Sequence, residues 1–453
     1  MRLTHCASAF YAGGTPDSGI ESFYEQPPDG IPWVNISDLT AQPILKSTKK
    51  HISEAGRKSK NLRLVPAGAV LYSMYASLGT VSLLLVEACI NQAILGIVPD
   101  ERLIRPEWLY FWLSHLRPNV TCLASSSTQA NLNAAKVRSL PVLVPPLHEQ
   151  DEALQFLKSA ELGFARLIRN KRRLIALLNE EKQAVIQQSV TRGLDPDAPL
   201  KPSGVEWLGD IPAHWATVPL LRCISELSDY RGATPEKVDS GIQLVTAKNV
   251  RSGWIDYQVS QEFVRSEDYQ TIMRRGRPNI GDLLLTMEAP LGNVALVDRT
   301  DIALAQRVVR FGLRPSSLVP QFALYATLAR YFQDQLHMRA TGSTALGIKA
   351  SKLAQLQVFL PPIEEQEEVA TYLDDRLSAI DGTVHSAHRE IDLIREYRTR
   401  LIADVVTGQL DVRESQFDDD FTVKDLDLGD VELLDEADVS LEDDGEILDD
   451  ETA

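Results

Sequence analysis

The sequence lacks the cysteines and long apolar stretches that mark secreted or membrane proteins. Only four cysteines occur in 453 residues, at scattered positions, and none forms a C-x-x-C pair. This usage favours a reduced, cytoplasmic protein and indicates neither disulfides nor a zinc site. No signal peptide opens the chain, and the most apolar stretch, residues 81–98, contains Glu87, Asn91 and Gln92. We therefore expect no membrane-spanning helix.

Motifs for catalysis are missing as well. The chain has no G-x-x-x-x-G-K-[ST] loop for ATP hydrolysis and no G-x-G-x-x-G motif. The Pro-Pro pairs at 145–146 and 361–362 lack the preceding Asn or Asp and the following aromatic residue that amino-methyltransferases use. Residues 180–182 (Glu-Glu-Lys) could mimic part of a nuclease site, but a solvated helix face explains them better. His385 and His388 have no third metal ligand nearby, so we predict no catalytic residue, cofactor or metal in this chain.

Acidic residues are concentrated at the C-terminal end. Residues 416–453 hold 17 of the Asp and Glu residues and one Lys, so the rest of the chain has a net charge near −1 rather than −17. Such a segment repels itself and is expected to be disordered. By contrast, residues 1–140 carry 13 Lys and Arg against 10 Asp and Glu, and residues 205–360 carry 17 against 15. Both regions permit nucleic-acid binding without demanding it.

The chain contains an internal repeat. Residues 145–150 (Pro-Pro-Leu-His-Glu-Gln) return as residues 361–366 (Pro-Pro-Ile-Glu-Glu-Gln), shifted by 216. The same shift aligns residues 191–195 with 407–411 without a gap, as expected for long helices in a fixed register. The preceding regions repeat more loosely, with shifts between 213 and 219, which indicates two related domains with loops of different length. The loosely repeated pairs are 11–16 with 230–235, 68–74 with 281–287, 78–81 with 291–294, and 127–128 with 343–344.

Each helical segment carries a heptad pattern. Positions 154 to 189, in alternating steps of three and four, are apolar at seven of eleven sites, and the positions 216 residues later are apolar at ten of eleven. This pattern predicts two coiled-coil helices, each about 65 Å long. We expect the helices to pair with each other as an antiparallel coiled coil, which would relate the halves by a pseudo-twofold axis. Pairing of each helix with another chain is the alternative.

Between the helices the pattern is that of mixed domains. Short apolar runs such as 69–72, 81–86 and 281–285 predict strands, and residues 108–113 and 322–328 predict buried helices. The fold class is therefore α+β: two domains of mixed α/β structure joined by two long helices. The predicted boundaries are 1–140 for the first domain, 141–192 for the first helix, 193–204 for a linker, 205–360 for the second domain, 361–413 for the second helix, and 414–453 for the acidic tail.

Two basic strips are candidate phosphate contacts, although ordinary solvated loops would also explain them. Uncharged polar residues on glycine-rich turns could read base edges, although turn chemistry accounts for most of them. The DNA-binding candidates of the first domain are Lys46, Lys49, Lys50, Arg57, Lys58, Lys60, Ser77, Thr80, Gln92, Thr128, Gln129 and Asn131. Those of the second domain are Lys248, Arg251, Arg274, Arg275, Arg277, Asn293, Arg307 and Thr344.

Residues 190–196 and 201–215, ending in Trp-Leu-Gly-Asp-Ile-Pro-Ala-His-Trp, resemble the junction between the first conserved helix and the second target-recognition domain of type I restriction–modification specificity subunits. The repeated Pro-Pro-x-x-Glu-Gln helix starts and the Gly-Gly-Thr-Pro loop at 13–16 fit the same family, and the resemblance covers residues 1 to about 413. One departure is that the Trp-to-Trp segment at 207–215 has no counterpart before Tyr11. Either the first domain lacks its first strand or the chain start has been set too late.

The resemblance implies a non-catalytic subunit that binds double-stranded DNA. Each target-recognition domain would read half of a split sequence, and the helices would set the unread gap and dock two methyltransferase subunits. S-adenosylmethionine, ATP and Mg would serve those partners and an ATP-dependent restriction subunit, not this chain. A structural coiled-coil scaffold without sequence-specific reading is the alternative; it explains the heptads but not two basic domains with divergent loops.

Overall fold

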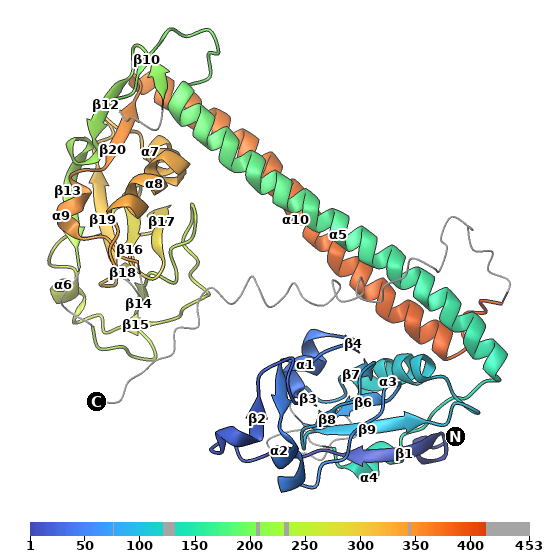
Figure 1. Cartoon of the computed structure of the whole chain (residues 1–453). Helices are drawn as coiled ribbons and strands as arrows, with labels where there is room; N and C mark the ends of the chain where they lie inside the picture. Colours follow the sequence, from blue (N-terminus) through green and yellow to red (C-terminus); the bar gives the residue numbers. More distant parts are fainter. Residues whose placement is uncertain (76, 121–131, 205–208, 231–234, 343–345, 414–453) are drawn as a thin grey trace. The chain divides into compact units, whose positions relative to one another are not determined.

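The computed structural model describes residues 1–75, 77–120, 132–204, 209–230, 235–342 and 346–413 (Figure 1). The predicted acidic tail lies outside this part of the chain. Two compact units are present: Met1–Arg173 with Ala387–Ala453, and Leu174–Ser386. The helices α5 (Leu147–Arg192) and α10 (Ile363–Val406) each contribute to both units.

The first unit is built on a five-stranded sheet in the order β1-β9-β6-β7-β4. Neighbouring strands are antiparallel except for the parallel pair β7 and β4. Every residue of β6 and β7 is buried, because α3 packs against these two apolar strands. The elements are β1 (Ala7–Ala12), β4 (Ile44–Leu45), β6 (Val70–Ser73), β7 (Val81–Leu84), β9 (Ile94–Pro99) and α3 (Pro106–Val120).

A second sheet of the first unit has the order β2-β5-β3-β8. The short helices beside the sheets begin at residues that satisfy free backbone N–H groups: Asn35 forms a capping box with Asp38, and the Ser53 and Asn133 side chains accept hydrogen bonds from Gly56 and Lys136. The elements are β2 (Tyr24–Glu25), β3 (Ile31–Val34), β5 (Lys50–Ile52), β8 (Cys89–Ile90), α1 (Ile36–Ala41), α2 (Glu54–Ser59) and α4 (Ala134–Arg138), with 3-10 turns at Leu3–His5 and Glu21–Phe23.

The second unit repeats this plan. Its larger sheet has the order β13-β19-β16-β17, and a three-stranded sheet has the order β15-β14-β18. The sheet elements are β13 (Ile224–Asp229), β14 (Ile242–Val245), β15 (Phe263–Val264), β16 (Leu283–Met287), β17 (Leu291–Leu296), β18 (Ile302–Leu304) and β19 (Val308–Leu313). The paired strands beside them are β10 (Leu200–Pro202) with β11 (Asp210–Pro212), and β12 (Ala216–Pro219) with β20 (Gln357–Leu360). The helices are α6 (Tyr269–Ile272), α7 (Pro320–Leu328), α8 (Arg330–Arg339) and α9 (Ala350–Leu353), with a 3-10 turn at Leu220–Cys223.

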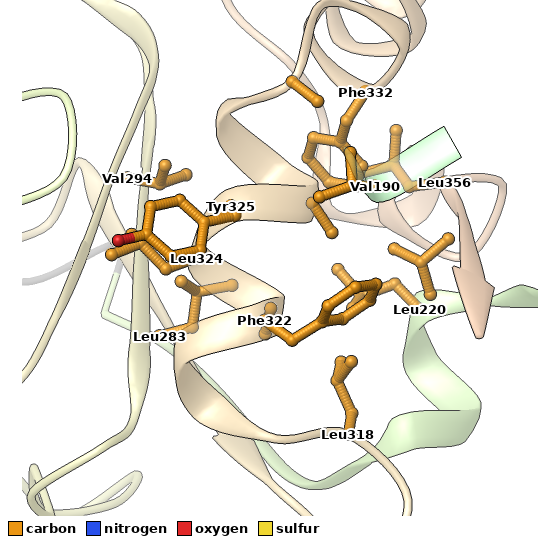
Figure 2. Packing of buried hydrophobic residues seen from close by; sticks show 14 of the residues in the cluster. Val190, Leu220, Leu283, Val294, Leu318, Phe322, Leu324, Tyr325, Phe332 and Leu356 are labelled. Carbon is orange, nitrogen blue, oxygen red and sulfur yellow. The ribbon is translucent and has the colours of Figure 1, made fainter. Parts of the chain in front are cut away.

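The main core of the second unit joins its larger sheet to its helices. Phe322, Leu324 and Tyr325 of α7 are buried in one cluster with residues of β16 and β17. Figure 2 shows Val190, near the end of α5, close to Phe332 and Leu356 in the same cluster. The long helix is therefore anchored in the hydrophobic core of the domain that follows it.

Strand pairing confirms that the two domains are copies of one fold. In the first unit β3 pairs with β5 antiparallel and with β8 parallel; in the second, β14 pairs with β15 antiparallel and with β18 parallel. The order β1-β9-β6-β7 likewise matches β13-β19-β16-β17. One difference concerns the β12–β20 pair, which has four residues on each strand, whereas the first unit has a single bridge between Arg2 and Pro141 at the equivalent place.

The last residue of the Pro-Pro-x-x-Glu-Gln motif has the same structural role in both copies. Gln150 is fully buried, accepts a hydrogen bond from the Arg105 backbone N–H at 2.8 Å and donates to the carbonyls of Leu103 and Pro145. Gln366 repeats this pattern with the backbone groups of Val319, Ser317 and Pro361. The glutamine ties the first turn of each long helix to the loop that precedes α3 or α7, satisfying backbone groups that burial would otherwise leave unpaired.

The two long helices are antiparallel, as the heptads predict. Within the first unit Glu161 pairs with Arg398 and Lys171 with Glu390; within the second, Lys182 pairs with Asp381. Partner numbers in α10 fall as those in α5 rise, which is the mark of an antiparallel pair. The ten apolar heptad positions predicted in α10 are all buried or half-buried. Gly193 and Gly408, each with φ +73°, follow the two helix ends as the sequence predicts.

Trp215 holds the end of α5 in place. Trp215 is fully buried, and its indole N–H donates to Glu365 Oε1 at 3.0 Å. A Cβ on Gly193 would lie 3.2 Å from both the Trp215 ring and Glu365 Oε1. Glycine at 193 therefore satisfies the left-handed backbone and the close approach of this tryptophan together.

Candidate DNA interface

In the first unit the basic strip follows β4 and runs through β5 and α2. The side chain of Arg57 donates two hydrogen bonds to Glu54, at 2.6 and 2.8 Å, and Lys58 lies 3.5 Å from the same carboxylate. The hydrogen bonds from Arg57 are the main reason that the pKa of Glu54 is lowered to about 2. Two of the predicted phosphate contacts thus already share a carboxylate.

The remaining lysines of the strip differ in their surroundings. Lys46, Lys49, Lys50 and Lys60 are all exposed. Within the part of the chain that the structure describes, Lys49, Lys50 and Lys60 form no ion pair. These three are therefore the lysines of the strip best suited to contact DNA phosphates and release the counterions bound there.

The basic strip of the second unit lies on equivalent elements. Arg274, Arg275 and Arg277 follow β15 and α6, just as Arg57, Lys58 and Lys60 belong to or follow β5 and α2. Arg274 and Arg277 are exposed, and the Arg277 guanidinium lies 5.9 Å from the centre of the Tyr269 ring. Arg275 donates to the Asp229 carbonyl at 2.6 Å. Lys248 and Arg251 lie in the loop after β14; Lys248 is exposed and Arg251 is half-buried.

The polar candidates of the first unit meet where β6 ends and β9 begins. The Thr15 hydroxyl donates to the Gln92 side-chain oxygen, and the backbone of Gly13 passes so close to Asn91 that a Cβ would lie 1.9 Å from its carbonyl oxygen. Gln92 is exposed, Ser77 is half-buried, and Thr80 is 7% exposed. Thr80 therefore faces the interior of the turn. Thr128, Gln129 and Asn131 lie outside the described residues.

The equivalent edge of the second unit carries a cavity of about 450 Å³ that is open to solvent on one side. Arg307 is exposed at this cavity, and Gln306 lies beside it. Asn293 lies in β17 at the place of Thr80, and its amide donates to the Val250 carbonyl at 2.8 Å, so it holds the neighbouring loop. Thr344 lies outside the described residues. The cavity is lined by Met287, Glu288, Gln306, Arg307, Thr341, Gly347, Ile348 and Lys349.

Backbone hydrogen bonds show that the two edges correspond residue by residue. Met74 N–H donates to Ala93 and Met287 N–H donates to Arg307, which makes Gln92 and Gln306 equivalent. Sequence reasoning selected Gln92 but missed Gln306, together with Glu288, Thr341 and Lys349. The available signal was the repeat of Asn91-Gln92-Ala93-Ile94 as Ala305-Gln306-Arg307-Val308, at a shift of 214.

The arrangement suits recognition rather than catalysis. Lysines and arginines on loops can neutralise phosphates, and glutamine and arginine can form paired hydrogen bonds with adenine and guanine edges. Among the described residues there is no cluster of three or more metal-binding side chains, and Cys6, Cys89 and Cys223 are buried free thiols. No helix in the described ranges is both long and apolar enough to cross a membrane.

Two repeated α/β domains, each with a basic strip and a glutamine at one sheet edge, are joined by long antiparallel helices. These features define a two-domain nucleic-acid recognition protein. The chain belongs to the family of the type I restriction modification DNA specificity domain, whose model matches residues 16–176 and 261–385. Members are the DNA sequence-specificity subunits of these systems, and methylation and cleavage reside in partner subunits. The family and the fold class predicted from the sequence are confirmed.

Known relatives agree with this assignment. The chain is 25% identical over 285 residues to the type I restriction enzyme MjaVIII specificity subunit of Methanocaldococcus jannaschii. The match covers 62% of this chain and 64% of the relative, so the chain spans a little under two thirds of that relative's length. It is 24% identical over 334 residues to the EcoBI specificity subunit of Escherichia coli, covering 71% and 69%. A solved chain from a type I restriction–modification system, studied for complex assembly and conformational transition, has the same fold: the TM-score is 0.63 at 16% identity, over 90% of this chain and 97% of that one.

Proposed function

We propose that this chain reads a bipartite DNA target, one half-site for each domain, and docks two methyltransferase subunits along α5 and α10. The observation that carries the proposal is the repetition of a basic strip and a glutamine-bearing sheet edge on equivalent elements of both units. Their sequences differ where base reading is expected: Ala93 in one edge is replaced by Arg307 in the other. Two copies of one scaffold with different polar residues suit two different half-sites.

The chemistry of the assembled complex belongs to other chains under this proposal. S-adenosylmethionine would serve the methyltransferase subunits, and ATP and Mg would serve a translocating restriction subunit. The complex would act in the cytoplasm, where the DNA of a bacterial or archaeal cell is accessible. This chain contributes the address on the DNA, through phosphate contacts for affinity and base-edge contacts for specificity.

The phosphate contacts of the first domain can be tested by charge removal. Replacing Lys49, Lys50 and Lys60 together by Gln should weaken binding of the assembled methyltransferase complex to all duplexes alike. If each lysine neutralises one phosphate, the slope of log affinity against log salt should fall by about 0.9 per lysine. Binding to target and random duplexes at several salt concentrations measures both effects.

The matched control removes three exposed charges that local acids already compensate. Arg102, Arg330 and Arg413 pair with Asp100, Asp334 and Asp411. Their joint replacement by Gln should leave the salt slope unchanged. An unchanged slope in the lysine variant would contradict the phosphate-contact assignment. Absence of salt-dependent binding to random duplex would instead support the scaffold alternative.

A further inference from the structure

Strand β19 carries a buried arginine that the proposed DNA contacts do not include. The Arg310 side chain is fully buried. Its guanidinium lies 2.5 Å from Asp282 Oδ2 and 2.5 Å from Glu226 Oε2, and Nη2 donates to the Ser228 hydroxyl at 2.8 Å. A buried charge is costly unless it is paired in this way. Asp282 is buried with Arg310, whereas Glu226 reaches it from the half-exposed surface of β13.

The same cluster supports the backbone of the basic loop Arg274–Arg277. The Ser228 hydroxyl donates to the Arg275 carbonyl at 2.8 Å, and the Tyr230 hydroxyl donates to the Gly276 carbonyl at 2.9 Å. In return, the Arg275 guanidinium donates to the Asp229 carbonyl. The end of β13, together with Tyr230 that follows it, is thus connected to the loop by three hydrogen bonds.

Gly276 shows how closely the loop rests on the cluster. Its φ is +145°, and a Cβ there would lie 2.2 Å from the Ser228 hydroxyl oxygen and 2.4 Å from Arg310 Nη2. A side chain at 276 would therefore displace the loop or the ion cluster. Glycine at 276 thus allows the backbone of the loop to lie directly against Arg310. Arg274 and Arg277 are exposed on either side of this contact.

The fold itself does not need this arginine. Strand register places Gly96 of β9 at the position of Arg310, because Gly96 lies opposite Tyr11 and Leu71 as Arg310 lies opposite Ser228 and Leu284. A Cβ on Gly96 would meet the side chain of Val65, so the first unit fills this space with an apolar residue. The same sheet forms there without a buried charge. The ion cluster is therefore a feature of the second domain and its basic loop.

We propose that Arg310 is a positioning residue that holds the Arg274–Arg277 loop so that Arg274 and Arg277 face the phosphate backbone of the second half-site. This inference rests on the proposed function, because it explains how the basic strip of the second domain is held in position for DNA binding. A loop already held in its binding conformation loses less conformational entropy when it binds phosphates. The ion cluster around Arg310 contributes that rigidity. An apolar contact, such as the one that Val65 makes in the first unit, would fix the position of the loop less specifically.

A double-mutant cycle tests this assignment in the assembled methyltransferase complex. Tyr230→Phe removes only the hydroxyl that holds the Gly276 carbonyl, and Arg310→Lys keeps a positive charge but loses the guanidinium fork. Each should lower affinity for target duplex, by about threefold to tenfold for Tyr230→Phe, the value of one lost hydrogen bond. In an Arg274→Gln/Arg277→Gln background, which itself should reduce the salt slope by about two contacts, neither change should lower affinity further.

The control is Tyr331→Phe, which removes another buried tyrosine hydroxyl, one that lies in the separate core around α7 and α8. It should leave DNA affinity unchanged. Equal affinity losses from Tyr230→Phe in both backgrounds would overturn the positioning role, because the effect would not pass through the loop arginines. An unchanged salt slope in the Arg274→Gln/Arg277→Gln variant would also overturn it. Bipartite methylation persisting in that variant would show that the proposed function stands independently.

Discussion

Lengthening α5 and α10 by one heptad each should lengthen the unread gap of the DNA target by about three base pairs. Seven helical residues add about 10.5 Å, and each base pair occupies about 3.4 Å along the duplex. Duplicating residues 168–174 and 385–391 preserves the heptad phase of both helices, so the apolar positions still meet. Both half-sites should remain as they were, because neither domain is altered. Sequencing of methylated bases in a strain that carries the variant measures the gap directly.

A heptad inserted into α5 alone serves as the comparison. It leaves seven residues of α5 without partners in α10, so we expect loss of stable assembly rather than a new gap. An unchanged gap in the double insertion, with methylation retained, would contradict the role of the helices in spacing. Altered half-sites would show that the helices also influence base reading.

Breaking the Glu161–Arg398 pair should strongly destabilise the paired helices. Both side chains occupy heptad positions at the helix interface, where Glu161 is 4% exposed. The single N–H of Arg398 Nε is shared between the two carboxylate oxygens, at N···O distances of 2.8 and 2.9 Å. Glu161→Ala takes this carboxylate away from the half-buried Arg398, which costs about 3 kcal/mol. The free energy of unfolding, followed by chemical denaturation of the full chain, should fall by that amount.

The control for this prediction is an exposed pair in the same helices. Lys171 lies 2.5 Å from Glu390, whose side chain is 50% exposed, so Lys171→Met should cost less than about 1 kcal/mol. Replacing Glu161 and Arg398 together by Leu should restore most of the lost stability. Equal destabilisation by Glu161→Ala and Lys171→Met would show that burial does not set the strength of the Glu161–Arg398 pair.

The Glu161–Arg398 pair also distinguishes one half of the coiled coil from the other. Under the 216-residue shift, the positions of Glu161 and Arg398 correspond to Leu377 and Lys182.

The parts of the fold that follow a period could be predicted from the sequence. The heptads identified the buried faces of α5 and α10 because about one residue in each helical turn must meet the partner helix. The motif ending in Gln150 and Gln366 was visible as a helix start, but its role depends on carbonyls 47 and 49 residues away, which no local pattern reveals. The structural role of the repeated glutamine therefore depends on tertiary contacts, which follow only from the folded structure.

The candidate site was predictable only in part, for physical reasons. The basic strips could be predicted from the charged residues of the loops. Exposed lysines and arginines need no partner from a distant part of the chain, so the local sequence is enough to find them. Thr80 occurs on a glycine turn like an exposed residue but packs inward, and Arg57 is compensated by Glu54 one helical turn away. Arg310 lies within the apolar strand Val308–Leu313, and only the approach of Asp282, Glu226 and Gly276 explains a charge at that position.

Exchange of one recognition domain tests the central claim most directly. In a chimaera, residues 1–140 are replaced by the corresponding domain of a relative with a different target, and residues 141–453 are kept. Sequencing of methylated bases then compares the parent and the chimaera in the presence of the same methyltransferase subunits. The account predicts that one half-site changes to that of the relative, while the other half-site and the gap stay the same. Changes in both half-sites, or none in either, would contradict the claim that each domain reads its own half of the target.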